Sequence, residues 1–115
     1  MRGLTHLLSR TMGKMMLSVR SDDTKLYIEG LYEPSSLMMF KRLLSGEQQK
    51  LTEPKDLDLT GLVGSDSGLI AVLLAFQRVA NEKGWSVCLI NANAGIKGLI
   101  TLGQLEDFFV LHDSQ

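Results

Sequence analysis

Cysteine, proline and tryptophan are scarce in this sequence, which has one cysteine, two prolines and one tryptophan among 115 residues. A chain with a single cysteine forms no intramolecular disulfide, which fits a reducing compartment. Cys88 lies in the apolar run 87–90, so we expect it to behave as a small buried hydrophobic side chain. No apolar run approaches the roughly 18 residues of a membrane span, and the first residues lack the apolar region of a secretory signal. The sequence therefore predicts a cytoplasmic protein without a membrane span.

Residue patterns typical of catalytic and metal centres are also missing. The two histidines, His6 and His112, lie at opposite ends of the sequence, and neither has a second ligand or a nucleophile at a recognisable spacing. The sequence contains neither the Gly-x-x-x-x-Gly-Lys phosphate loop nor the Gly-x-Gly-x-x-Gly nucleotide turn. We therefore expect no enzymatic activity, no catalytic residue, no metal site and no cofactor.

The charge is distributed unevenly along the chain. The formal net charge is −1, yet the first twenty residues contain four basic residues and no acidic one, which leaves eight basic and thirteen acidic residues for the remainder. An acidic body argues against nucleic-acid binding, which needs a basic face. Leu4, Leu7 and Leu8 would suit an amphipathic basic arm. Because chain ends are commonly disordered, we interpret residues 1–14 instead as a flexible basic prefix.

Hydrophobic spacing predicts alternating strands and helices in one domain over residues 15–115, and a 44% hydrophobic content suits a single compact core. Strands are expected at 15–20, 25–29, 55–59, 85–91 and 108–111, and helices at 34–46, 67–83 and 94–102. The first two strands should form a hairpin around residues 21–23, and a polar loop should follow Gly46. A hairpin followed by alternating helices and strands predicts an α/β fold, with helices packed on a mixed sheet of four to five strands.

The start of the longest predicted helix is the most informative segment. Ser65, Asp66 and Ser67 are all competent to cap a helix, and they open directly into an apolar helix from Gly68 onward. Such a cap stabilises a helix by about 1 kcal/mol without any further role. The unpaired N–H groups and the dipole of a helix start also attract anions, including phosphoserine. Asp66 places a like charge where a bound anion would lie, which disfavours a nucleotide or phosphate ligand.

Several short segments, in their order and spacing, resemble the STAS domain family. This is the fold of bacterial anti-sigma-factor antagonists, found also in anion transporters and lipid-transport complexes. The resemblance extends over roughly residues 15–111 and includes a Gly-x-x-acid turn at Gly30 and Glu33. Its other segments are Leu57-Asp58-Leu59, Asp66-Ser67-Gly68-Leu69, Gly84, Leu89-Ile90-Asn91, Leu102-Gly103 and Leu105.

The resemblance implies a regulatory site at this helix start. In the family a phosphorylatable serine lies in an Asp-Ser-Ser-Gly-Leu motif, and this chain is one residue short between Asp58 and Leu69. If the missing residue belongs to the loop, Asp66 occupies the phosphoserine position, with Ser65 before it. If it belongs to the helix start, Ser67 is the phosphorylatable serine. We favour the first alignment, because a deletion inside the first helical turn would rotate every later side chain by about 100°.

The resemblance also implies a function that depends on protein contacts. We expect a non-catalytic regulator of the anti-sigma-factor antagonist type, whose partner is an anti-sigma factor that is also a serine kinase. The expected partner-binding residues are Gly64, Ser65, Asp66, Ser67, Gly68, Ile70 and Leu74. The alternative is a small STAS subunit that supports the ATPase of a bacterial lipid ABC transporter. A sheet edge left uncovered near the C-terminus would make a homodimer possible.

Overall fold

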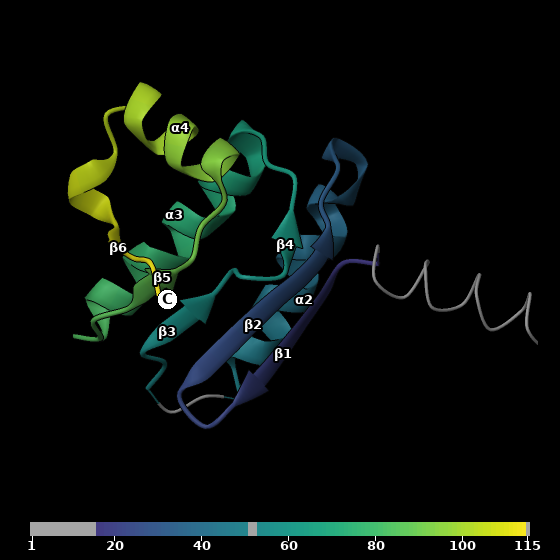
Figure 1. Cartoon of the computed structure of the whole chain (residues 1–115). Coiled ribbons are helices and arrows are strands. Elements are labelled where there is room, and N and C mark those ends of the chain that lie inside the picture. The colour runs from purple at the N-terminus through teal and green to yellow at the C-terminus, as the bar shows by residue number, and fades with distance from the viewer. Residues whose placement is uncertain (1–15, 51–52, 115) are drawn as a thin grey trace, which may run out of the picture.

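The computed structural model describes residues 16–50 and 53–114, which form one twisted sheet with helices packed against it (Figure 1). The strands are β1 Ser18–Asp22, β2 Lys25–Leu31, β3 Asp56–Asp58, β4 Leu62–Val63, β5 Cys88–Ile90 and β6 Val110–His112. The helices are α2 Leu37–Gln48, α3 Ser67–Glu82 and α4 Ala94–Leu102, with short 3-10 helices η1 Pro34–Ser36 and η2 Glu106–Phe108. The basic prefix predicted at residues 1–14 lies outside the described residues.

The sheet is mixed, as the sequence predicts. Its strand order is β1-β2-β3-β5-β6, and β4 pairs with β2 beyond the end of β3. The β1–β2 hairpin is antiparallel, whereas the other pairs are parallel. The α/β fold is therefore confirmed. Because these neighbouring strands are parallel, the carboxyl ends of β2, β3, β5 and β6 lie along the same border of the sheet, where α3 and α4 begin.

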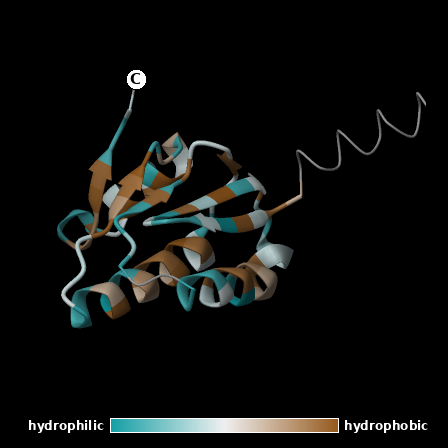
Figure 2. Cartoon of the chain, turned by 90° about the horizontal axis from the view of Figure 1, so that it is seen from below, coloured by the Kyte–Doolittle hydropathy of each residue, from teal (hydrophilic) through white to brown (hydrophobic). Residues whose placement is uncertain are grey.

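The core lies between the sheet and two helices. Leu26 and Ile28 of β2, Leu57 of β3 and Leu89 of β5 are fully buried, and they alternate with half-exposed residues on the other face. Helices α2 and α3 lie together on one side of the sheet (Figure 2). Alternation of buried and exposed side chains is the signature of a sheet that is covered on one face.

Several element bounds differ from those predicted. The helix expected to end at Gly46 continues to Gln48, because Gly46 is exposed and leaves the helical hydrogen bonds intact. The turn of the first hairpin lies at 23–24, with Asp23 at a φ of 51°, so β1 extends to Asp22. The strand expected at 85–91 pairs only over Cys88–Ile90, because its neighbour β3 is three residues long. The two-residue β4 was not predicted. It forms where the chain turns at 59–62 and resumes pairing with β2.

Within the described residues, no helix has the length and apolar character needed to cross a bilayer.

Two glycines should respond to substitution in opposite directions. Gly30 in β2 has a φ of 101°, and a side chain there would collide with the backbone carbonyl of Met16. Gly30→Ala should therefore lower the free energy of unfolding by about 2 kcal/mol. An added Cβ at the helical Gly46 would meet no atom within 4 Å, so Gly46→Ala should raise the free energy of unfolding by about 0.5 kcal/mol. Urea denaturation measures both changes, and a Gly30→Ala chain as stable as wild type would contradict this account.

Candidate functional site

Asp66 begins α3 and caps it. Its backbone is extended, with a φ of −158°, and its carboxylate accepts a hydrogen bond from the Leu69 amide at 2.8 Å. The carbonyl of Asp66 accepts the first helical bond, from the Ile70 amide at 3.2 Å. The capping role that the sequence predicts is thus confirmed, and it holds a negative charge at the positive end of the helix dipole.

The start of α4 lies against the loop that leads into α3. Asn93 caps α4 by accepting a hydrogen bond from the Ile96 amide at 2.9 Å. The amide nitrogen of the same side chain donates to the carbonyls of Leu62 and Gly64, both at 3.2 Å. The Ser65 hydroxyl packs so closely on Gly95 that a Cβ there would force the hydroxyl to move. One asparagine therefore positions two helix starts relative to each other.

Tyr32, which follows β2, underlies the α3 start. Its side chain is 3% exposed and packs edge-on against Phe40, with ring centroids 6.0 Å apart. The buried hydroxyl makes no hydrogen bond of good geometry. Burial, and after it the neighbouring Asp66 carboxylate, together raise the pKa of Tyr32 to about 12. The Tyr32 carbonyl faces Gly64, whose φ of 96° lets the chain turn there without a collision.

The predicted partner-binding residues divide into a surface group and a groove group. Ser67 is exposed, and Gly64, Ser65, Asp66 and Gly68 are partly exposed around it. Ile70 is only 5% exposed and Leu74 is partly buried, so they lie along a groove and offer a partner little surface of their own.

Two apolar grooves, each of about 340 Å³, meet at the start of α3. The first lies between α3 and α4 and includes Ser67, Ile70, Leu74, Leu99, Leu102 and Leu105. The second lies between α2 and α3 and includes Leu37, Leu44, Gly68, Val72 and Phe76. At its upper end a Cβ on Gly68 would lie 3.2 Å from the Leu37 side chain, which shows how closely α2 and α3 approach. The helix start is therefore the ridge between two hollows.

Three exposed apolar side chains on the elements that flank this ridge are not predicted from the sequence. Val63 of β4 is 61% exposed, Met38 of α2 is 66% exposed and Leu102 of α4 is 82% exposed. A signal exists for Leu102 alone, since in a helix it points about 200° away from the buried Ile100. For Val63 and Met38 the exposure depends on β4 and on the packing of α2, which local spacing does not reveal.

We call the exposed part of this region, formed by Met38, Val63, Ser65, Asp66, Ser67 and Leu102, the α3-start surface. It combines one carboxylate and two hydroxyl groups with three apolar side chains. Among residues 16–50 and 53–114, no group of three or more His, Cys, Asp or Glu residues could hold a metal ion.

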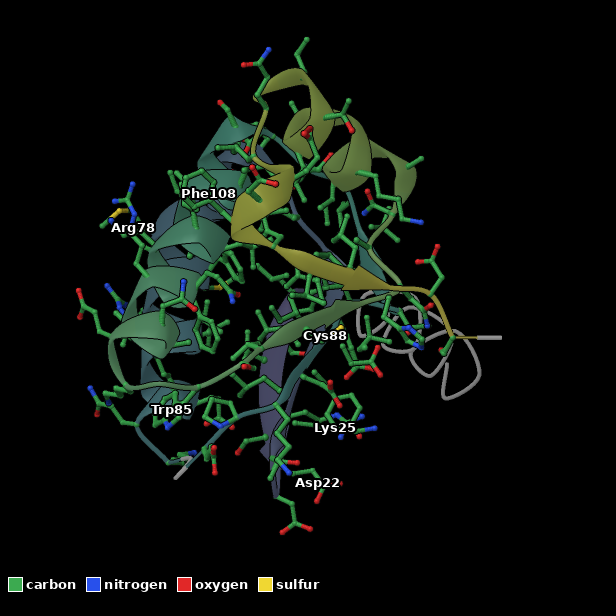
Figure 3. The ribbon with its side chains drawn as sticks, turned by 90° about the vertical axis from the view of Figure 1, so that its left-hand side faces the viewer. Asp22, Lys25, Arg78, Trp85, Cys88 and Phe108 are labelled. Atoms are coloured by element: carbon green, nitrogen blue, oxygen red, sulfur yellow. The ribbon has the colours of Figure 1, made fainter. Side chains whose placement is uncertain are left out.

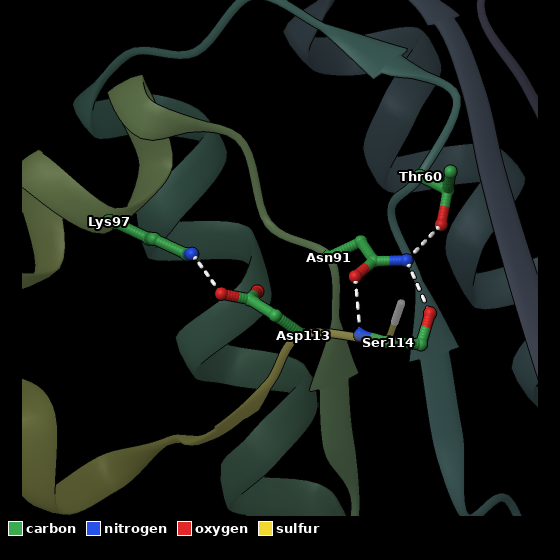
Figure 4. A network of polar contacts seen from close by, with 5 residues as sticks. All are labelled: Thr60, Asn91, Lys97, Asp113 and Ser114. Atoms are coloured by element: carbon green, nitrogen blue, oxygen red, sulfur yellow. Dashed lines mark hydrogen bonds and ion pairs between the residues drawn. The ribbon is translucent and has the colours of Figure 1, made fainter.

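A separate network of polar contacts lies further along the same edge (Figure 4). Asn91, which follows β5 with a φ of 55°, donates to the hydroxyls of Thr60 and Ser114, both at 2.8 Å. It also accepts a hydrogen bond from the Ser114 amide at 2.7 Å. Lys97 of α4 forms an ion pair with Asp113 at 2.6 Å. These contacts hold the segment after β6 against β5 and α4, so they serve the fold at this edge.

Tyr32→Phe should change how stability depends on alkaline pH. The folded chain holds the pKa of Tyr32 at about 12, against an ordinary value of 10.0. Stability should therefore be intact below pH 10 and fall by about 3 kcal/mol as the pH rises through 12. Tyr32→Phe removes this loss, and at pH 7 it should cost less than about 1 kcal/mol because the hydroxyl has no hydrogen bond to lose. Denaturation at pH 7 to 12 measures the effect. Tyr27→Phe is the control, and it should retain the alkaline loss of stability. The same alkaline loss in Tyr32→Phe would contradict the assignment.

No protein-family model and no curated relative matches the sequence. Solved structures do match. A Thermotoga maritima protein described as an anti-sigma factor antagonist has a TM-score of 0.70 at 17% identity, over 86% of this chain and 87% of its own. The anti-sigma factor antagonist SpoIIAA in its unphosphorylated form has a TM-score of 0.66 at 12% identity, over 87% of this chain and 89% of its own. Bacillus SpoIIAA in its phosphorylated form has a TM-score of 0.64 at 13% identity, over 87% of this chain and 92% of its own. The chain therefore has the STAS fold that its sequence resembles.

Proposed function

We propose that this protein is a non-catalytic regulator of the anti-sigma-factor antagonist type, and that it binds its protein partner through the α3-start surface. The observation that carries the proposal is the combination of a fixed charge with exposed apolar side chains at this surface. A capped helix start bears one fixed negative charge, and exposed apolar side chains of three other elements surround it. A protein partner suits such a surface because apolar side chains supply contact area while a charge at its edge controls affinity.

The shape of the surface also supports a protein partner. A ridge between two apolar grooves can enter a complementary surface, while side chains of the partner fill the hollows on either side. Val63 and Leu102 are far more exposed than apolar residues of their size usually are. Burying both would remove apolar area from water, which is the main driving force of association.

Charge at the start of α3 is the means by which such binding would be regulated. In the alignment that we favour, Asp66 occupies the phosphoserine position and supplies one permanent negative charge, whereas a phosphate would supply close to two. In the other alignment Ser67 is modified, and its exposed position leaves it accessible to a kinase. The structures of SpoIIAA in unphosphorylated and phosphorylated forms support a switch of this kind in the fold.

Val63→Asp should abolish partner binding without unfolding the chain, because Val63 is 61% exposed and makes little contribution to the core. We expect affinity purification from the native cells to recover a histidine-kinase-like ATPase with the wild type and to lose it with Val63→Asp. Val110→Asp is the matched control, since Val110 is 59% exposed on β6, away from the α3-start surface, and should retain the partner.

Recovery of an ATP-binding-cassette protein would instead favour the alternative transporter subunit. Equal recovery of a partner by wild type and Val63→Asp would contradict the proposed surface.

Substitutions at the helix start test the role of charge. Asp66→Ser keeps a cap but removes the negative charge, so partner affinity should rise about tenfold if Asp66 stands in for phosphoserine. Ser67→Glu adds a charge and should lower affinity by a similar factor, whereas Ser67→Ala should leave it unchanged. Isothermal titration with the recovered partner measures all three. Unchanged affinity in Asp66→Ser would refute the mimicry, and phosphate on Ser67 in protein from the native cells would support the other alignment.

A further inference from the structure

The face of the sheet opposite α2 and α3, here called the open face, carries two rows of adjacent side chains. Strand register places Arg20, Tyr27, Asp58, Ile90 and His112 in one row and Asp22, Lys25, Asp56, Cys88 and Val110 in the next. Cys88, Lys25 and Asp22 lie on the side of the sheet away from α3 (Figure 3). Among the described residues, no helix covers these rows.

An uncovered face is unusual for the central strands of a parallel sheet, which are commonly buried on both sides. Tyr27, Cys88 and Ile90 are half-buried here although no element lies over them, and Val110 is 59% exposed. The apolar area of β5 and β6 on this face therefore remains in contact with water. Covering this apolar area with a further layer would stabilise the folded chain.

The open face is acidic at its centre. Asp56 and Asp58 project from β3 on the same face, and in the described part of the chain neither forms a salt bridge. Lys25 is the register neighbour of Asp56 but forms no ion pair with it. Arg20 is engaged by Glu29 at 3.0 Å, and Asp58 accepts hydrogen bonds from the amide and hydroxyl of Thr60. A cationic segment would therefore find two carboxylates without ionic partners at the middle of the sheet.

Residues 1–14 have the matching chemistry and the necessary reach. They contain Arg2, Arg10 and Lys14, no acidic residue, and the three leucines at positions 4, 7 and 8. The segment precedes Met16 and β1 at one edge of the sheet. From Met16, Asp58 and Asp56 lie two strands away, about 10 Å across the sheet and about 13 and 20 Å along the strands. Fourteen residues extend about 21 Å as a helix and about 46 Å when fully extended, so Asp56 and Asp58 are within reach.

We propose that residues 1–14 dock on the open face, with their basic side chains on Asp56 and Asp58 and their leucines over Cys88, Ile90 and Val110. The docked segment completes a third layer over the sheet and neutralises its acidic centre. It leaves the α3-start surface unaltered, so the docking and the proposed function stand or fall independently.

Cys88 provides a natural reporter, since it is the only cysteine of the chain and lies on the open face. The full chain carrying Arg2→Glu, Arg10→Glu and Lys14→Glu should lose the docking. If the segment covers Cys88 nine-tenths of the time, its alkylation by the uncharged reagent iodoacetamide should be about tenfold faster in this variant. Mass spectrometry of the intact chain measures the rate.

The matched control is Lys41→Glu, Arg42→Glu and Arg78→Glu, which makes the same change of charge at exposed positions of α2 and α3, on the other side of the sheet. Its Cys88 rate should equal that of the wild type. Carboxylates brought near Cys88 would raise the pKa of the thiol and slow alkylation; burial and, after it, Asp56 already raise this pKa. A faster reaction in the prefix variant therefore reports uncovering and not a change of charge.

Salt provides a second measurement that requires no substitution. About 0.5 M sodium chloride should weaken the ionic contacts and accelerate alkylation of the wild type while leaving the prefix variant unchanged. Equal Cys88 rates in wild type and prefix variant would overturn the proposal. Protection that disappears on dilution of the wild type would also overturn it, because a second copy of the chain would then be the occupant.

Discussion

The amide side chain of Asn93 is the contact on which the arrangement of the functional edge depends. Its oxygen caps α4, and its nitrogen donates to two carbonyls of the loop that enters α3. Only a group with both a donor and an acceptor can do this, so a carboxylate of the same shape would leave the loop carbonyls without partners. Ser65 then packs on Gly95, and Asp66 is directed to cap α3. These contacts tie the loop that enters α3 to the start of α4.

This arrangement also fixes the position of the charge at residue 66, to which we assign a regulatory role in the proposed function. The carboxylate is held by the Leu69 amide at the end of a helix dipole, so it cannot move away from a partner that approaches along the helix axis. Exposed apolar side chains reach the same surface from α2, β4 and α4. In the proposed function, apolar contact would supply affinity there and the charge beside it would regulate that affinity.

Much of the fold could be predicted from local patterns. The 3.6-residue spacing of apolar residues gave α3 and α4 almost to the residue, because each helix has a buried stripe and a side-chain cap. The extent of β5 and the existence of β4 could not be predicted in this way. Both are set by the length of the neighbouring strand, which is a property of the sheet and not of the segment.

The candidate site shows the same division. Asp66, Ser67 and Gly68 were predictable, since cap residues before an apolar helix have a local signature. The exposure of Val63 and Met38 was not, because it arises where β4, α2 and α3 meet. Nor could sequence spacing show that Ile70 is buried in a groove, since a helix with a wide apolar stripe can turn either side outward.

The two faces of the sheet differ in what they carry. The covered face carries the core and orients α3, whereas the open face, with Asp56 and Asp58 at its centre, bears no part of the α3-start surface. A partner that binds as we propose should therefore leave the β1–β2 hairpin untouched.

Amide hydrogen exchange of the chain, alone and with its recovered partner, tests the central claim most directly. The account predicts slower exchange in the complex at residues 64–68 and at the end of α4, with no change in the β1–β2 hairpin. Protection in the hairpin, with unchanged exchange at residues 64–68, would contradict it.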